Sequence, residues 1–216
     1  MSKALPAAHE QWLREYSRKD AQLKREHVFQ CPAWEEVVAL AADYPVESFR
    51  GVVLALLTEA PPQLAENLAS LHVAWSEDEA EQMDKQLLNY ALLCTNGNAT
   101  PSLAFNRRAK AHIRHPVAFP CSEKLKVTLV HWQRYLLSTV NDPEQLLLGR
   151  CSASDVRGTV QALFGTSNPL SRIRTSFACS ARSNGRSTGE VAHCLGFSTA
   201  HVECIPKSLA FEKVQE

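Results

Sequence analysis

The sequence predicts a mainly α-helical protein, with a multi-helix N-terminal domain over residues 1–149 and a smaller helical, serine-rich region over residues 150–216. Apolar residues recur at helical spacing through most of the chain, and prolines and glycines separate these stretches. No segment shows a convincing alternation of apolar and polar residues, which would indicate half-buried strands. The chain has 216 residues, 45% of them apolar, which is enough to bury a sizeable core.

Three short helices are predicted in the first third of the chain. Apolar residues at positions 34, 37, 38, 41 and 44 follow Pro32 at the spacing of one helix face, and Pro45 ends the pattern. The pattern returns over residues 46–57, and again over residues 64–75 after Pro61 and Pro62. Tight breaks therefore join three consecutive helices.

Two longer helices are predicted in the middle of the chain. Ser76 and Glu79 fit a capping box, and the helix after them carries apolar residues as far as Cys94. A second capped stretch begins at Ser122, and its apolar residues at 125, 129, 132, 136 and 140 give the clearest amphipathic helix of the sequence. Residues 141–143, Asn-Asp-Pro, end it.

Composition changes after Gly149, and we place a domain boundary there. All four tryptophans and all four tyrosines precede this glycine, whereas residues 151–216 hold ten serines and four of the seven cysteines. Helix signals continue in this region, over residues 154–164 and 169–177. The C-terminal region is therefore also expected to be helical.

The sequence favours a cytoplasmic or nuclear protein that is not secreted. The first residues show no apolar run of the kind found in secretory signals, and the most apolar window, residues 52–57, is far short of the ~20 residues that cross a membrane. The seven cysteines are an odd number without a CxxC pair, which is typical of reduced thiols. We expect no membrane partner.

Charge is segregated along the chain although 23 bases balance 23 acids. Residues 59–84 contain seven acids and no Lys or Arg, whereas residues 107–134 contain seven bases and one acid, Glu123. Overall neutrality excludes a protein that binds nucleic acid through bulk charge. Any such binding would depend on the local basic segment.

The basic segment predicts a phosphate-binding stripe. A dense run of bases can neutralise phosphates and release counterions, and two further lysines extend it. The stripe comprises Arg107, Arg108, Lys110, Arg114, Lys124 and Lys126. Two alternatives stay open: a solvated helix face without a function, and an intramolecular or homotypic partner for the acidic segment.

Residues 187–209 contain the pattern of a helix-turn-helix. This motif needs a small residue where its helices cross, a glycine in the turn, and apolar residues that join the helices. Ala192 takes the crossing and Gly196 the turn. The joining positions hold Val191, Leu195, Phe197, Val202 and Ile205.

Over about 30 residues this segment resembles the helix-turn-helix of LuxR- and AraC-type transcription regulators. The resemblance implies that the second helix lies in the major groove of DNA and points Ser198, Thr199, Ala200, Glu203 and His201 toward it. That helix has no Lys or Arg before Lys207, and Pro206 limits it to roughly two turns. A plain helical hairpin that packs on the main domain is the alternative.

Signals for catalysis or metal binding are weak. The sets Cys94, His112, His115, Cys121 and Cys179, His193, His201, Cys204 lack the close ligand pairs of structural zinc sites. The sequence contains no nucleophile elbow, phosphate-binding glycine loop or HExxH motif. We therefore predict a non-enzymatic protein with no catalytic residues, no metal and no cofactor.

These observations favour a non-enzymatic nucleic-acid-binding or regulatory protein. DNA or RNA would contact the basic stripe, and the helix-turn-helix segment would add a second contact. The alternative is a helical protein–protein interaction adaptor or assembly subunit, in which the acidic face (residues 59–84) and the basic face (residues 107–134) dock on neighbouring copies to form a homo-oligomer.

Overall fold

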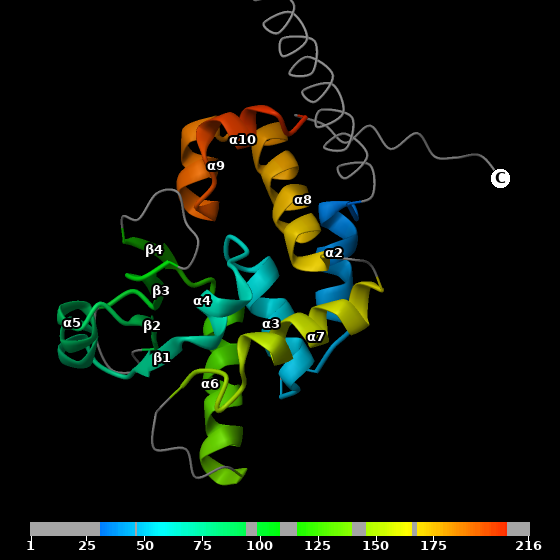
Figure 1. Ribbon diagram of the computed structural model, residues 1–216. Helices are drawn as coiled ribbons and strands as arrows, with labels where there is room; N and C mark the ends of the chain where they lie inside the picture. The colour runs from blue at the N-terminus through cyan, green and yellow to red at the C-terminus, as the bar shows by residue number, and fades with distance from the viewer. Residues whose placement is uncertain are drawn as a thin grey trace, which may run out of the picture.

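The computed structural model describes residues 31–45, 47–93, 99–108, 116–139, 146–165 and 168–206. Helices dominate this part of the chain, as the sequence predicts, but a four-stranded sheet accompanies them. The sheet and α5 (Glu77–Lys85) lie on one side of the molecule, and α8 to α10 lie together at its upper end in Figure 1. The expectation that no segment forms strands is wrong.

The predicted helices over residues 34–57 are confirmed as α2 (Trp34–Ala42) and α3 (Phe49–Thr58). The Ser48 hydroxyl oxygen accepts a hydrogen bond from the Gly51 amide and so caps the start of α3. Most residues of this helix are apolar and buried, and Arg50 near its start is exposed. The helix therefore forms the centre of the main core rather than one of its edges.

The third predicted helix is much shorter than expected. α4 (Ala65–Ala69) stops before Leu71, and the next residues form strand β1 (Leu71–Ala74). Helix and buried strand both produce short apolar runs, so periodicity alone could not separate them at this point.

The sheet has the order β1-β2-β3-β4. β2 (Asn89–Leu92) runs parallel to β1, with α5 as the connection between them. β3 (Ser102–Phe105) and β4 (Val117–Pro120) continue the sheet in antiparallel pairs. All four residues of β2 are buried, which explains why no alternation marks that strand in the sequence.

The predicted helix from Ser76 to Cys94 is right in its first half and wrong in its second. Ser76 caps α5 through a hydrogen bond from the Glu79 amide, as the capping box predicts. Leu87, at a φ of 55°, adopts the left-handed conformation and turns the chain from α5 into β2. Cys94 itself lies outside the described residues.

The clearest predicted helix is confirmed as α6 (Glu123–Thr139). Leu125, Leu129, Trp132 and Leu136 face the core, as their spacing requires, and Val140 lies outside the described residues. The Trp132 indole and the Gln133 amide both donate to the carbonyl oxygen of Leu147, at 2.9 and 2.8 Å. These two bonds fix the segment that follows α6 against its buried face.

The C-terminal region is helical, as predicted, with α7 (Ala153–Phe164), α8 (Pro169–Ser183), α9 (Thr188–Leu195) and α10 (Thr199–Glu203). α7 and the first half of α8 contribute Val156, Val160, Leu170 and Ile173 to the main core. The second half of α8 forms a separate small core with α9 and α10. The domain boundary at residue 149 stays a prediction.

No helix in the described part of the chain is long and apolar enough to cross a membrane.

Gly51 and Gly158 offer a matched test of this packing. A Cβ at Gly51 would lie 2.1 Å from the carbonyl oxygen of Pro45, whereas a Cβ at Gly158, within α7, meets nothing within 4 Å. We expect Gly51→Ala to lower the free energy of unfolding by roughly 2–3 kcal/mol. Gly158→Ala should raise it by about 0.5–1 kcal/mol, because alanine favours the helix. Urea unfolding measures both values, and equal effects would contradict the close approach at Gly51.

Candidate nucleic-acid interface

The bases of the predicted stripe do not share one environment. Arg107 follows β3 and has an exposed side chain. Its backbone is fixed by Asn89, whose amide oxygen accepts from the Arg107 N–H at 2.9 Å and whose amide nitrogen donates to the Arg107 carbonyl oxygen at 3.0 Å. Arg107 is therefore an exposed cation on a rigid support. Lys110 and Arg114 lie outside the described residues.

Arg108 points inward, although it is the direct neighbour of Arg107. Its side chain is only 8% exposed, and its two terminal nitrogens donate to the carbonyl oxygens of His193 at 2.7 Å and Cys194 at 2.9 Å. The sequence predicts a phosphate contact for this arginine. In the structure its guanidinium instead holds the end of α9.

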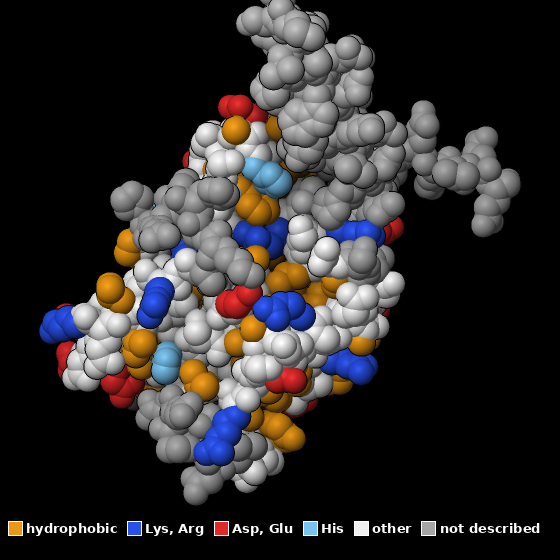
Figure 2. Space-filling model, viewed as in Figure 1, with side chains coloured by type: hydrophobic (Ala, Val, Ile, Leu, Met, Phe, Trp, Pro, Cys, Tyr) orange, Lys and Arg blue, Asp and Glu red, His pale blue; other side chains and the backbone are white. Residues whose placement is uncertain are grey.

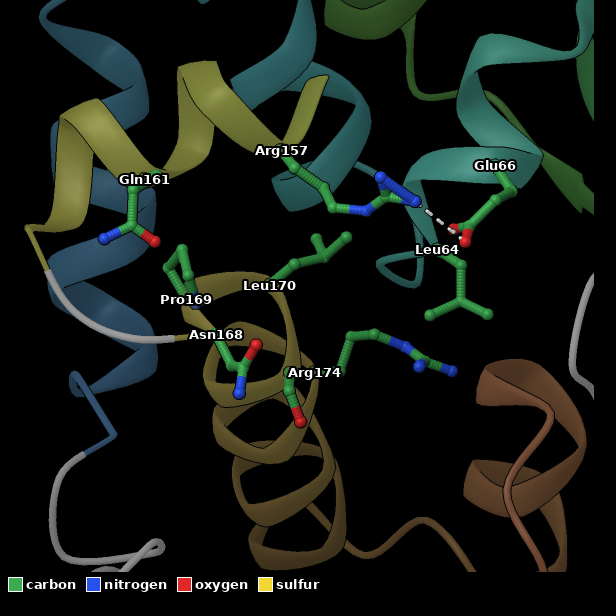
Figure 3. Close-up of a pocket in the computed structure, with 9 residues that line it drawn as sticks. Leu64, Glu66, Arg157, Gln161, Asn168, Pro169, Leu170 and Arg174 are labelled. Atoms are coloured by element: carbon green, nitrogen blue, oxygen red, sulfur yellow. Dashed lines mark hydrogen bonds and ion pairs between the residues drawn. The ribbon is translucent and has the colours of Figure 1, made fainter. Parts of the chain in front are cut away.

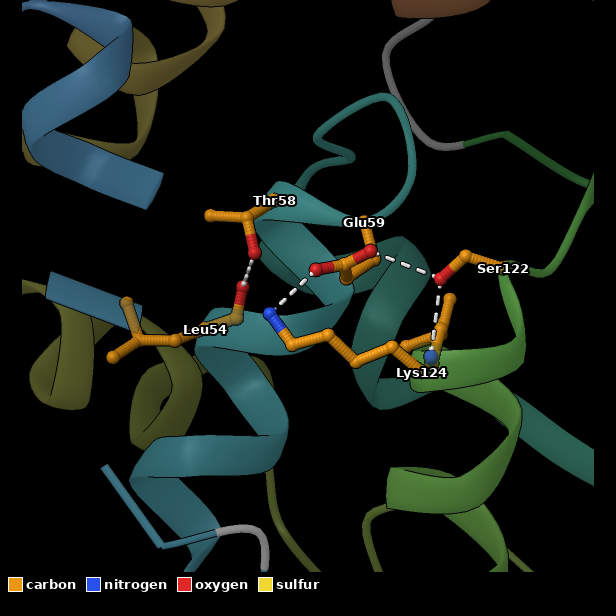
Figure 4. Close-up of polar contacts among 6 residues, drawn as sticks. Leu54, Thr58, Glu59, Ser122 and Lys124 are labelled. Carbon is orange, nitrogen blue, oxygen red and sulfur yellow. Dashed lines mark hydrogen bonds and ion pairs between the residues drawn. The ribbon is translucent and has the colours of Figure 1, made fainter. Parts of the chain in front are cut away.

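Lys124 and Lys126 lie on the first turn of α6 and have acidic neighbours. The Lys124 ammonium is 2.8 Å from a carboxylate oxygen of Glu59, whose other oxygen accepts from the Ser122 hydroxyl at 2.9 Å (Figure 4). The Lys126 ammonium lies 3.9 Å from a carboxylate oxygen of Glu123. At Glu59 the acidic and basic segments thus contact each other within one chain, which is one of the alternatives that the sequence leaves open.

Figure 2 shows the Lys and Arg side chains of one face as separate patches among acidic and apolar groups. Arg134, at the other end of the basic segment, is also exposed. The bases of this segment are divided between exposed positions and contacts inside the molecule.

The helix-turn-helix segment forms two short helices joined by a tight turn. Ser187 and Glu190 make a reciprocal capping box at the start of α9. Gly196 ends α9 in the left-handed conformation at a φ of 67°, and the Ser198 hydroxyl caps α10. Val191, Leu195, Val202 and Ile205 are buried in the small core, as their joining role requires.

The residues predicted to face DNA lie on and before α10. Thr199, Ala200, His201 and Glu203 are exposed, and Ser198 is half-buried. α10 has only five residues, one turn and a half, so it is shorter than the two turns that the sequence predicts. Its described surface offers an acid and a histidine but no Lys or Arg.

Three polar side chains converge on the C-terminal end of α9. Arg108 donates to the carbonyl oxygens of His193 and Cys194, Gln63 donates to that of Cys194 at 2.9 Å, and Arg174 donates to that of Leu195. A helix leaves its last carbonyls without partners and carries partial negative charge there, so two guanidiniums stabilise this end. We call Gln63, Arg108 and Arg174 the α9 clamp.

Burial perturbs both arginines of the clamp. Arg174 is 7% exposed, and burial together with the nearby Arg108 charge lowers its pKa to about 10, against a smaller opposing effect of Glu66. Burial also lowers the pKa of Arg108. The Arg174 guanidinium lies over the ring of Phe197, 4.4 Å from its centroid. Two cations therefore share a poorly solvated site.

Sequence reasoning missed Gln63 and Arg174 as site residues. Arg174 follows Leu170 and Ile173 on the inward face of α8, and a base within an apolar stripe was the available signal. Gln63 follows Pro61 and Pro62 and has no comparable signal. Its partner Cys194 is 131 residues away along the chain.

Burial changes the acidity of two cysteines in the described part of the chain. Burial raises the pKa of Cys121 to about 11, and that of Cys31 to the same range. Within the described ranges, no three or more His, Cys, Asp or Glu side chains lie close enough together to hold a metal ion. His112 and His115 lie outside the described residues.

No known family model matches the chain, and no curated protein matches it. Among solved structures, its fold is similar to that of XerA recombinase, with a TM-score of 0.53 and 12% sequence identity. The match covers 82% of this chain and 56% of the recombinase chain. At this identity the likeness concerns the fold alone, and this chain spans little more than half of the recombinase's length.

Arg108 and Arg107 allow a direct test of the clamp. Arg108→Gln removes charge-assisted hydrogen bonds to two carbonyls, so we expect a loss of about 1.5–3 kcal/mol in the free energy of unfolding and faster amide exchange at the end of α9. The matched variant Arg107→Gln alters an exposed side chain and should change stability by less than about 0.5 kcal/mol. If the two variants unfold at the same urea concentration, the clamp contributes nothing.

Proposed function

We propose that this protein is a non-enzymatic DNA-binding protein. Its fold likeness to a recombinase, over 82% of the chain, is the observation that carries the choice of DNA as the partner. That neighbour is a DNA-binding protein, which supports DNA as the partner proposed for this chain. The separated charges of the sequence support the same partner, because phosphates require local rather than overall positive charge.

The proposed contact surface centres on Arg107. This arginine is exposed, sits on a backbone fixed by Asn89, and begins the segment that also carries Lys110 and Arg114. Lys126 and the partly neutralised Lys124 follow this segment in the sequence. Arg108 is excluded from this surface, because its guanidinium is used inside the molecule.

The α9–α10 hairpin would supply a secondary contact, in keeping with its resemblance to LuxR- and AraC-type motifs. Its exposed residues Thr199, Ala200 and Glu203 include no cation. Hydroxyl groups and a helix N-terminus can donate to phosphates, but they add little without Arg or Lys nearby. The hairpin would therefore orient the protein more than it would increase affinity.

An adaptor function is the second candidate, and α5 favours it. This helix exposes Glu77, Asp78 and Glu81 on its surface, and Glu59 already shows that acidic and basic segments of this chain attract each other. A second copy could bring its basic segment to α5. Reversing the charges of α5 alone, or of the basic segment alone, should then abolish the assembly. Reversing the charges of both together should restore it.

Salt-dependent binding tests the DNA proposal. We expect fluorescence anisotropy to show binding to mixed-sequence duplex at about 50 mM salt, weakening tenfold or more by about 200 mM. Arg107→Gln should weaken binding several-fold on every sequence and reduce the salt slope by about one, since it removes one phosphate contact.

Arg50→Gln is the matched control for this test. Arg50 is an exposed arginine on α3, outside the proposed surface, so its loss should leave the salt slope unchanged. Parallel titrations with single-stranded DNA and RNA identify the preferred nucleic acid. Equal effects of the two variants would overturn the Arg107 surface, and an absence of binding at low salt would favour the adaptor.

A further inference from the structure

A pocket of about 270 Å³ lies between α4, α7 and the start of α8. Arg157 of α7 and Arg174 of α8 line it, and Leu64 and Leu170 supply its apolar walls. In Figure 3 the Arg157 side chain extends toward Glu66 of α4, and the Arg174 side chain lies on the other side of Leu170 and extends toward α9. None of the residues proposed to contact DNA lines it.

Arg174 is an incompletely paired buried cation. One terminal nitrogen donates to the Leu195 carbonyl, whereas its buried Nε has no hydrogen-bond partner among the described residues. A buried donor without an acceptor costs free energy, and a buried charge is normally neutralised by a partner. Arg108 adds a like charge nearby. The site therefore holds more buried positive charge than its neighbours neutralise.

The acidic residue that lines this pocket, Glu66, already forms an ion pair. Glu66 of α4 accepts from Arg157 at 2.9 Å, and the dashed line in Figure 3 marks this pair. The Arg157 side chain is 49% exposed, so its guanidinium stands at the opening of the pocket. Together the two arginines and Glu66 leave one net positive charge.

The start of α8 adds donors to the same pocket. Asn168, Pro169 and Ser171 line the pocket; Asn168 is the N-cap of α8, a helix of 15 residues, and the other two lie in its first turn. The Asn168 side chain makes no capping hydrogen bond to this helix. The Asn168 amide and the Ser171 hydroxyl can thus donate into the same space as Arg174, and the positive end of the helix dipole lies beside it.

We propose that this pocket binds a small molecule through a phosphate or carboxylate group. The oxyanion would accept from the Nε of Arg174, from Arg157 and from polar groups at the start of α8, and the two leucines would contact the rest of the ligand. The volume is slightly below the range typical of drug-sized ligands, which suits a small metabolite. Glu66 competes with the ligand for Arg157.

Two substitutions in one ion pair give opposite expectations. Arg157→Gln removes a donor to the oxyanion and should weaken binding of inorganic phosphate roughly tenfold. Glu66→Gln removes the competing carboxylate and should strengthen it several-fold. Both variants break the same pair, so a purely structural effect would move the two affinities in the same direction.

Isothermal titration calorimetry of the full chain with inorganic phosphate, and separately with acetate, measures these affinities at constant ionic strength. Arg134→Gln on α6 is the matched control, because its exposed arginine does not line the pocket. We expect saturable heat with phosphate or acetate, none with chloride, and no change in the control. An absence of saturable heat, or equal shifts in both pair variants, would overturn the proposal.

Competition with DNA duplex distinguishes a site for a small free ligand from a site for the phosphates of the DNA backbone. For a small-molecule site, phosphate binding persists in the presence of saturating duplex, and Arg157→Gln leaves duplex affinity unchanged. Loss of phosphate binding with duplex, together with weaker duplex binding by Arg157→Gln, would assign the pocket to DNA and overturn the proposal. Phosphate binding remains measurable if the protein binds no duplex, so the two proposals fail independently.

Discussion

The end of α9 is the point on which the arrangement of the C-terminal region depends. The small core of α8, α9 and α10 is separate from the main core, so apolar packing alone does not fix the hairpin against the rest of the molecule. Cys194 of α9 packs against the main core, and the α9 clamp adds polar contacts at the same helix end. Gln63 reaches α9 from the segment before α4, Arg108 from the end of the sheet, and Arg174 from α8. Three distant parts of the chain thus meet at three consecutive carbonyls.

This attachment has an electrostatic cost. Arg108 and Arg174 are both buried, and each has an Nε without a hydrogen-bond partner among the described residues. Carbonyl oxygens and the partial negative charge of a helix end neutralise such cations less completely than a carboxylate would. The structure therefore concentrates positive charge beneath α9 and beside the pocket of Arg157. The hairpin and the pocket share that charge through Arg174.

Periodicity predicted the elements whose burial follows one face, and it failed at the short buried strands β1 and β2. α6 has one buried face and one exposed face, and its core residues were identified from their spacing alone. β2 is buried throughout, so the sequence gives no period of two that would separate it from the preceding helix. The sequence does not indicate the turn at Leu87 either, because leucine rarely adopts a positive φ. The capping residues Ser76 and Ser122 were the more reliable local signals, since each hydroxyl accepts from an amide only three residues further along.

The candidate site was less predictable than the fold because its contacts are long-range. Adjacent arginines, Arg107 and Arg108, look equivalent in the sequence, yet one is exposed and the other is buried against α9. The difference arises from residues about 85 positions away, which no local pattern contains. Both arginines follow strand β3, and their side chains lie in two different environments. A basic run at the end of a strand therefore divides between surface and interior, and only its exposed members are available to bind phosphate.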